Sequence, residues 1–550
     1  MAFERVTHLG PTGHTRDRIP MRPRPPTLSG GAMVTSSHSA VSFVGAQMLA
    51  GGGNAVDATL AMAAMTWLTL PGQCGIGGDA FAVVREPDGT VWTVGGSGYG
   101  PDGAGPDFFA ERGYGAIPLH GALAVAVPGA PAALSALHAR GATRSLDVLW
   151  EPVARLADKG LPCSAQTRDD VRSVLAAVRS DPGLSAVYTP HGNLPDVGTL
   201  LPQPDLAQTI RTLARDPSNF YHGRIAEHCV EALRAHGAPF SGDEWQACAR
   251  VSAEPALVGE YAGVVVHQTP LPTPGWMLLQ QAALCDRIVG SSSWMSSEAI
   301  DRMARAARMS FEDRMALCGA DSAGSQDVLS PEAIERQRGQ LSGHTSIRRG
   351  FSVLGGDTTS TVAVDHEGRA VSFIHSLAFL FGAKFTVPGT GIVLNNRLGR
   401  GAYLIPDHPN EVRPRRKPLH TLNAWIVTGG RGNLLHVGNT PGGDGQVQWN
   451  MQLLSHLLDH GLDPQEAVSA PRFTVFPGSD ADVVGRKAEL RVESRITEET
   501  REALRAAGHS VVVQDPWGAA GSAQIISVDE CGILSGGSDP RQQGVALGVE

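Results

Sequence analysis

The chain changes character near Gly350, and this change is the strongest constraint on its fold. From about Leu123 to Ile347, apolar residues recur mostly at helical spacing, and several of these segments end in glycine, as helices commonly do. After Gly350, apolar and polar residues alternate in paired segments joined by short turns, a pattern typical of β-hairpins. The predicted hairpins cover 359–376, 422–438 and 523–537, and helices are expected between them near 446–460 and 498–507. Helices kept apart from antiparallel hairpins predict an α+β layered sandwich.

The first part of the chain predicts two helices and one more hairpin. The helices share the segment 37–70 and are separated by the glycine run 51–53, which suits the end of a helix. Asn54 suits the N-cap of the second helix, and Asp57 in its first turn complements the helix dipole. The hairpin covers 81–96 and turns at Pro-Asp-Gly.

Composition narrows the class of protein. The net charge of −9 argues against nucleic-acid binding, because phosphate contacts require clustered lysine and arginine. The N-terminus has no apolar core of signal-peptide length, and no apolar run is long enough to cross a bilayer. We therefore expect a cytoplasmic protein that binds a small molecule and neither nucleic acid nor membranes.

Common cofactor and metal motifs are absent from the sequence. It contains no P-loop, no HExxH helix, no EF-hand loop and no GxSxG elbow. The Gly-rich segments 75–79 and 95–100 lack the dinucleotide fingerprint. The 19 histidines are dispersed and form no ligand pair with cysteines or carboxylates. We expect no metal and no cofactor.

The segment GGDTTSTVAVD, residues 355–365, is the most suggestive for chemistry. Two threonines follow an aspartate and lead into an alternating apolar strand. Taken alone, a Thr-Thr pair at the start of a strand is an ordinary structural feature, because threonine favours strands. The other interpretation is a nucleophile that becomes exposed when the chain is cut before it.

Motifs around this segment occur in the order and spacing of one family. They are GGNAVDA, LPGQCGIGGDAF, AVAVPGAPAAL, FYHG, GDTTSTVAVD, VPGTGIVLNNR, KPLHTLNAWIV, GNTPGGDG and GSAQIISVDECGILSGGSDPR. Together they resemble the γ-glutamyltranspeptidase family of N-terminal-nucleophile hydrolases, from about Met33 to Gly544. The resemblance implies a four-layer αββα sandwich.

The resemblance also implies that the chain cuts itself between Asp357 and Thr358. Residues 1–32 would then be a lead-in, 33–357 the large-subunit region and 358–550 the small-subunit region. A threonine hydroxyl is a weak nucleophile unless a base lies beside it. Cleavage would give Thr358 a free α-amine with a pKa of roughly 8, which can accept the hydroxyl proton.

Three further residues match catalytic positions of the family. Ser376 takes the place of a threonine that hydrogen-bonds the nucleophile, and a polar strand residue is the alternative. Gly442 and Gly443 in TPGGDG match the pair that forms the oxyanion hole, where backbone N–H groups stabilise the developing negative charge. A simple turn is the alternative for this glycine pair.

The substrate-binding positions depart from the family pattern. Ser97, near Tyr99 in GGSGYGP, stands where γ-glutamyl-specific members have a carboxylate-binding arginine. Arg397 replaces a glutamine, and Arg400 replaces the aspartate that accepts the substrate ammonium. A pair of serines becomes His420 and Thr421. A cation in place of that aspartate disfavours an ammonium and favours a carboxylate or oxo-acid, although the arginines could instead be exposed loop charges.

These residues predict a self-processing threonine hydrolase or acyltransferase that acts on an amide or related carbonyl, and not on glutathione. One alternative is a biosynthetic member that hydrolyses a C–C bond to remove an oxalyl-type group, as in actinobacterial antibiotic pathways. Another is an unprocessed, non-catalytic binding or scaffold protein. After processing, the two fragments would stay together, and two such pairs could form a dimer.

Overall fold

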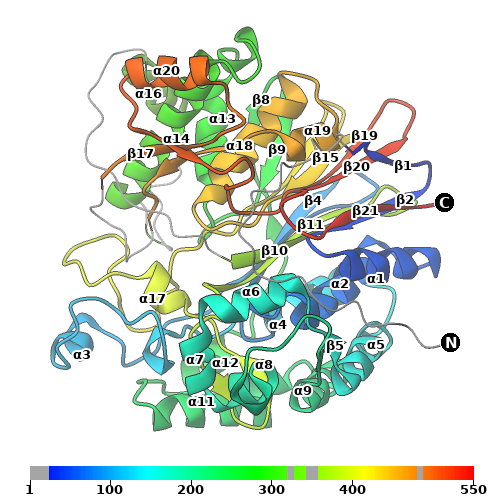
Figure 1. Cartoon of the computed structure of the whole chain (residues 1–550), viewed down its shortest axis with the longest axis vertical. Helices are drawn as coiled ribbons and strands as arrows, with labels where there is room; N and C mark the ends of the chain where they lie inside the picture. Colours follow the sequence, from blue (N-terminus) through cyan, green and yellow to red (C-terminus); the bar gives the residue numbers. More distant parts are fainter. Residues whose placement is uncertain (1–23, 318, 320–326, 342–356, 480–486) are drawn as a thin grey trace.

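The computed structural model describes residues 24–317, 319, 327–341, 357–479 and 487–550. Two seven-stranded sheets pack face to face, and helices cover the outer side of each sheet (Figure 1). The predicted four-layer αββα sandwich is therefore confirmed.

The first sheet combines strands from both ends of the chain with the hairpin predicted at 359–376. Its order is β21-β2-β10-β11-β3-β4-β7, and all neighbouring strands are antiparallel. Its strands are β21 (Val545–Val549), β2 (Ala32–Ser36), β10 (Asp357–Val364), β11 (Ala370–Ala378), β3 (Asp79–Arg85), β4 (Val91–Gly96) and β7 (Glu254–Pro255).

The second sheet contains the two other predicted C-terminal hairpins. Its order is β1-β20-β19-β15-β14-β9-β8. Its strands are β1 (Thr27–Ser29), β20 (Leu534–Ser538), β19 (Gln524–Val528), β15 (Leu434–Asn439), β14 (Ala424–Thr428), β9 (Val264–Gln268) and β8 (Leu257–Tyr261).

The helices form one layer on each sheet. Those packed on the first sheet include α1 (Ser39–Ala50), α2 (Ala55–Thr69) and α4 (Ala130–Gly141), and α5 (Leu146–Lys159) packs on α2. The second sheet is covered by α13 (Gly275–Cys285), α14 (Ser297–Leu317) and α18 (Gly445–Leu458). Asn54 caps α2 in a capping box with Asp57, as predicted.

Smaller elements complete the described chain. The other helices are α3 (Pro106–Ala110), α6 (Ala165–Ser173), α7 (Leu175–Ser180), α8 (Pro182–Tyr188), α9 (Pro204–Arg215), α10 (Asn219–His222), α11 (Arg224–Ala235), α12 (Asp243–Ala247), α16 (Pro331–Leu341), α17 (Arg397–Gly401), α19 (Pro464–Ser469) and α20 (Glu498–Ala506). The other strands are β5 (Leu161–Pro162), β6 (Leu200–Leu201), β12 (Thr386–Val387), β13 (Ile392–Val393), β16 (Phe473–Phe476), β17 (Glu489–Glu493) and β18 (Val511–Gln514).

Strand alternation decides which side chains of β10 and β11 point between the sheets. Val362, Val364 and Ile374 belong to the core between the two sheets, together with Ile426 and Val437 of the facing sheet. Since side chains alternate along a strand, Ser360 and Ser376 point to this same interior. The Thr358 hydroxyl lies with them, because it bonds the hydroxyl of Ser376.

Two details add to the expectations. The middle of the chain, predicted as mostly helical, also contains the β8–β9 hairpin, and residues 27–32 of the predicted lead-in contain β1 and the first residue of β2. Residues 1–23 of that lead-in lie outside the described part. Within the described residues, no helix has the length and apolar character needed to cross a membrane.

Candidate functional site

The pairing of β10 with β11 is irregular at the threonine pair. Asp357 pairs with Ala378, but Thr359 pairs with His375, so two residues of β11 face Thr358. This is a β-bulge, a feature that redirects side chains and is common beside active sites. Across it, the Thr358 hydroxyl donates a hydrogen bond of 3.1 Å to Oγ of Ser376. The structure thus brings the two predicted hydroxyl residues together, both buried.

The next threonine has a different environment. Thr359 is buried, and in the part of the chain that the structure describes its hydroxyl has no hydrogen-bond partner. By strand alternation it points away from the interior between the sheets. Of the two threonines, Thr358 is therefore the one whose hydroxyl bonds the predicted catalytic partner Ser376. The predicted cleavage site is backbone of β10, and the side chain of Asp357 lies outside the described residues.

The TPGGDG turn follows β15 and is tied to the same hairpin through Asn439. The Asn439 side chain donates to Oγ of Ser372 at 2.8 Å and to the carbonyl of Phe373 at 3.1 Å, and it accepts a hydrogen bond from the Ser360 hydroxyl. These bonds place the start of the turn against β10 and β11. The turn itself occupies the 440–445 segment that leads into α18.

Gly442 and Gly443 have φ values of +129° and +58°, in the region that favours glycine. Their carbonyls accept hydrogen bonds from the N–H groups of Gly445 and Gln446, at 3.1 Å each. Their own N–H groups donate to no acceptor among the described residues. Two such donors can stabilise an oxyanion that forms close to them.

Arg397 and Arg400 lie in the short helix α17, and their side chains are 1% and 2% exposed. They are not the exposed loop charges that the sequence left possible. The Arg400 guanidinium donates to the Ala378 carbonyl at 2.7 Å and stacks 4.5 Å from the Phe379 ring centroid. Because Ala378 pairs with Asp357, Arg400 lies beside the predicted cleavage junction.

Asp79 of β3 connects Arg397 to His420. Its carboxylate accepts a hydrogen bond from Nε of Arg397 at 3.2 Å and from the Gly129 N–H at 3.2 Å, and it lies 3.4 Å from Nε2 of His420. Burial raises the pKa of Asp79 to about 6, against the opposing pull of the Arg397 charge. Burial, followed by the charge of Arg397, lowers the pKa of His420 well below its ordinary value. The histidine is therefore neutral near pH 7.

Strand register places Ser376, Asp79 and Ser97 side by side in one row across the first sheet, next to Thr358. Ser376 of β11 pairs with Asp79 of β3. Because Ala80 pairs with Gly96 of β4, Asp79 lies opposite the following residue, Ser97. The Ser97 hydroxyl is buried and has no hydrogen-bond partner among the described residues. Sequence reasoning missed Asp79, although its motif GIGGD was noted, because strand register alone shows that it lies next to Ser376.

The remaining two predicted substrate residues are less tightly tied to this row. Tyr99 is half-buried, and the Lys417 ammonium lies 5.3 Å from its ring centroid. Thr421 is buried next to His420, and within the described residues its hydroxyl has no hydrogen-bond partner. In the described chain, no group of three His, Cys, Asp or Glu side chains is placed to hold a metal ion.

The family model of γ-glutamyltranspeptidase matches residues 41–549. The chain belongs to this family. It is 33% identical to the glutathione hydrolase-like YwrD proenzyme of Bacillus subtilis strain 168, over 94% of this chain and 98% of the relative. It is 30% identical to the oxamate amidohydrolase proenzyme of Klebsiella pneumoniae, over 95% and 99%.

A solved structure supports the same assignment. The cephalosporin acylase from Bacillus halodurans matches with a TM-score of 0.88 and 27% identity, covering all of both chains. The protein is therefore an N-terminal-nucleophile hydrolase or transferase of the γ-glutamyltranspeptidase family. Several relatives are named as proenzymes, which agrees with processing into two subunits in this family.

Proposed function

We propose that this protein is a self-processing amidohydrolase whose substrate carries a carboxylate or oxo-acid next to the reacting carbonyl. The observation that carries the proposal is the burial of Arg397 and Arg400 beside the Thr358 hairpin, with Arg400 on the Ala378 carbonyl. Buried guanidinium groups are well suited to bind carboxylates in a fixed orientation. The relative named as an oxamate amidohydrolase supports this substrate class, because oxamate carries a carboxylate next to its amide carbonyl.

Processing would break the Asp357–Thr358 peptide bond and release fragments of 357 and 193 residues from the 550-residue chain. The Thr358 hydroxyl attacks the Asp357 carbonyl, and the acyl group moves from nitrogen to oxygen. Water then hydrolyses the ester and leaves a free amine and hydroxyl on Thr358. The buried hydrogen bond to Ser376 orients this hydroxyl before the attack.

In the mature enzyme, the Thr358 α-amine takes the proton of its own hydroxyl while the oxygen attacks the substrate amide. The N–H groups of Gly442 and Gly443 stabilise the oxyanion. The substrate nitrogen leaves with the proton, and an ester to Thr358 remains. Attack by water, which gives its proton to the amine, releases the acid, and attack by an acceptor amine transfers the acyl group.

The position at Arg400 argues against glutathione as a substrate. A γ-glutamyl group presents an ammonium, and a guanidinium in the place of its acceptor repels it. Arg400 also donates to the Ala378 carbonyl, beside the predicted cleavage junction, where a guanidinium favours an anionic substrate end.

A gel, N-terminal sequencing and a substrate panel test the proposal. We expect two bands from the wild-type chain, Thr358 as the new N-terminus, and a single full-length band from Thr358→Ala. The mature protein should hydrolyse oxamate-type or N-acyl amides with a carboxylate and leave glutathione intact. A wild-type chain that stays at full length would favour the non-catalytic scaffold, and rapid glutathione turnover would contradict the substrate class.

A further inference from the structure

The oxyanion turn is packed around one tryptophan. A Cβ added at Gly442 would lie 2.0 Å from Cζ3 of Trp449, and one at Gly445 would lie 2.5 Å from Cη2 of the same ring. Gly521, on the loop that precedes β19, would place a Cβ 2.9 Å from this ring and 2.6 Å from the Pro441 carbonyl. Three glycines therefore enclose the indole of Trp449, and the position of this ring limits where the Gly442 backbone can lie.

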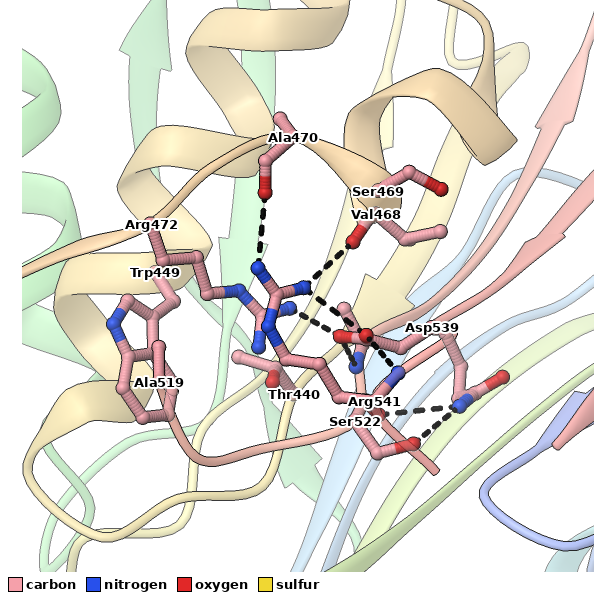
Figure 2. A network of polar contacts seen from close by, with 12 residues as sticks. Thr440, Trp449, Val468, Ser469, Ala470, Arg472, Ala519, Ser522, Asp539 and Arg541 are labelled. Carbon is pink, nitrogen blue, oxygen red and sulfur yellow. Dashed lines mark hydrogen bonds and ion pairs between the residues drawn. The ribbon is translucent and has the colours of Figure 1, made fainter. Parts of the chain in front are cut away.

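The indole is itself held by two groups. Its N–H donates to Oγ1 of Thr474 on β16 at 2.9 Å. The guanidinium carbon of Arg472 lies 5.2 Å from the Trp449 ring centroid, within the range of a cation–π contact. Figure 2 shows the Arg472 side chain beside this ring and directed toward Asp539.

Arg472 also holds the loop that carries Gly521. Its guanidinium donates to the Ala520 carbonyl at 3.0 Å and forms a buried ion pair with Asp539. Asp539 in turn accepts a hydrogen bond from the N–H of Ala523 at 2.9 Å. One side chain thus fixes both the indole and the loop that closes over it.

Arg472 belongs to a largely buried network in which Asp539 and Glu493 are paired with arginines. Arg541 donates to Glu493 at 2.8 Å and to Asp539 at 3.1 Å. Its Nη atoms also donate to the carbonyls of Val468 and Ala470 at 3.2 Å and 3.1 Å (Figure 2). Removing one partner of such a network leaves an uncompensated buried charge. The network therefore fixes the position of Arg472.

We propose that Arg472 and Trp449 are positioning residues for the oxyanion hole, acting through packing on Gly442 and not by contact with substrate. The inference rests on the proposed function, because it assigns Gly442 and Gly443 as oxyanion donors. Displacing these N–H groups weakens an interaction that is strongest in the transition state, so it lowers kcat with little effect on KM.

The chain offers a matched control. Arg495 also belongs to the ionic network, pairs with Glu493 and lies 3.5 Å from the ring centroid of an indole, that of Trp517. A Cβ at Gly442 or Gly445 would lie nearest to the ring of Trp449 and not to that of Trp517. Arg495 also donates to the Pro516 carbonyl on the loop that leads to Gly521, so Arg495→Lys changes a cation–π contact and an anchor of this loop but leaves the contacts of Trp449 with Arg472 and Thr474 in place.

The experiment compares Arg472→Lys, Trp449→Phe, the double variant and Arg495→Lys in steady-state kinetics with an oxamate-type amide. Lysine keeps the charge opposite Asp539 and loses the planar stack. We expect kcat to fall about tenfold to a hundredfold in both single variants, since loss of one oxyanion donor typically costs about a hundredfold to a thousandfold. KM should stay within about twofold, and Arg495→Lys should match the wild type.

Two outcomes would overturn the inference. One is an unchanged kcat in Arg472→Lys and in Trp449→Phe. The other is a double variant whose loss is the product of the single losses, because two residues that act through one contact should not add. If Arg472→Lys fails to fold, the kcat of Trp449→Phe decides the test.

Hydrogen exchange of the 440–446 segment separates this inference from the proposed function. Exchange should be faster in Arg472→Lys than in the wild type and unchanged in Arg495→Lys, whether or not the enzyme turns over. If exchange changes but the wild type shows no Thr358-dependent turnover, the proposed function is wrong and the packing role stands. If wild-type turnover is present but exchange and kcat are unchanged, the positioning role is wrong.

Discussion

At the scale of single residues, the hydroxyl of Ser376 is the first group to test. It accepts the Thr358 hydrogen bond and also one of 2.9 Å from the Ala378 N–H. Ser376→Ala removes a buried partner, which typically costs about 1–3 kcal/mol. We expect self-cleavage and kcat to slow about tenfold or more, while Ser376→Thr keeps the hydroxyl and stays within a few-fold of the wild type. A gel time course and kinetics measure both, and equal rates in the alanine variant would contradict the role.

Arg400 should act on substrate binding. Arg400→Lys keeps the charge, but a lysine cannot both hydrogen-bond the Ala378 carbonyl and stack on Phe379 as a planar guanidinium does. We expect KM for a carboxylate-bearing amide to rise about tenfold, with kcat within about threefold. Arg413→Lys is the matched control, because the Arg413 side chain is 59% exposed. An unchanged KM in Arg400→Lys would remove Arg400 from the substrate site.

At the scale of elements, strand β3 introduces a pH-dependent group into the row of site residues. The pKa of Asp79 is raised by burial to about 6, so the folded protein binds more protons than the unfolded chain between about pH 4 and 6. The stability contribution of this group is therefore present at low pH and declines as pH rises through this window. Burial, followed by the charge of Arg397, keeps the pKa of His420 well below its ordinary value.

The same titration should change substrate binding. Below about pH 6 Asp79 is protonated and no longer neutralises Arg397, which leaves more positive charge for an anionic substrate. We expect KM for a carboxylate-bearing amide to rise several-fold from pH 5 to pH 7. Asp79→Asn should keep KM low and remove most of this dependence, which KM measured across the range would test. A wild-type KM that falls with rising pH would contradict the assignment.

The sequence predicted correctly those features of the elements that depend on neighbouring residues alone. The β10–β11 hairpin, the break at 51–53 and the cap at Asn54 follow from turn residues, glycine and side-chain capping, and the structure contains all three. The β8–β9 hairpin was missed because it lies between long helical patterns. The bulge at Thr358 was missed because it depends on pairing register between two strands.

The site residues, too, could be predicted only where neighbouring residues in the sequence carry the signal. Thr358, Ser376 and the glycine pair could be predicted as site residues from motifs with known chemistry. Asp79 and the cradle of Trp449 could not, because their roles depend on which strands and loops lie side by side. Arg472 lies 27 residues after the last residue of the turn, Gly445 (472 − 445), and no spacing rule connects the two segments.

At the scale of the whole molecule, the described parts of the predicted fragments 1–357 and 358–550 are interleaved in both sheets. In the first sheet β10 lies between β2 and β11, and β11 lies beside β3. In the second sheet β14 pairs with β9, and β20 pairs with β1. Pulling the fragments apart would break these ladders and leave buried backbone groups without partners.

Side chains also join the two predicted fragments. Arg85 of β3 donates to the carbonyl of Gly432 at 3.0 Å and to that of Gly368 at 3.1 Å. Asp365 accepts a hydrogen bond of 3.0 Å from the N–H of Ala55 at the start of α2. One broken peptide bond removes none of these contacts.

We therefore expect the cleaved protein to remain one particle. Both fragments should co-elute in native size-exclusion chromatography, unfold in one cooperative transition, and separate only in denaturant. Neither fragment expressed alone should give a cooperative transition, because each would carry sheets with strands missing from their middle. The uncleaved Thr358→Ala chain, which has the same contacts, is the control and should elute at the same volume. Separate native peaks for the two fragments would contradict the interleaved packing, since a sheet cannot release its central strands and keep its hydrogen bonds.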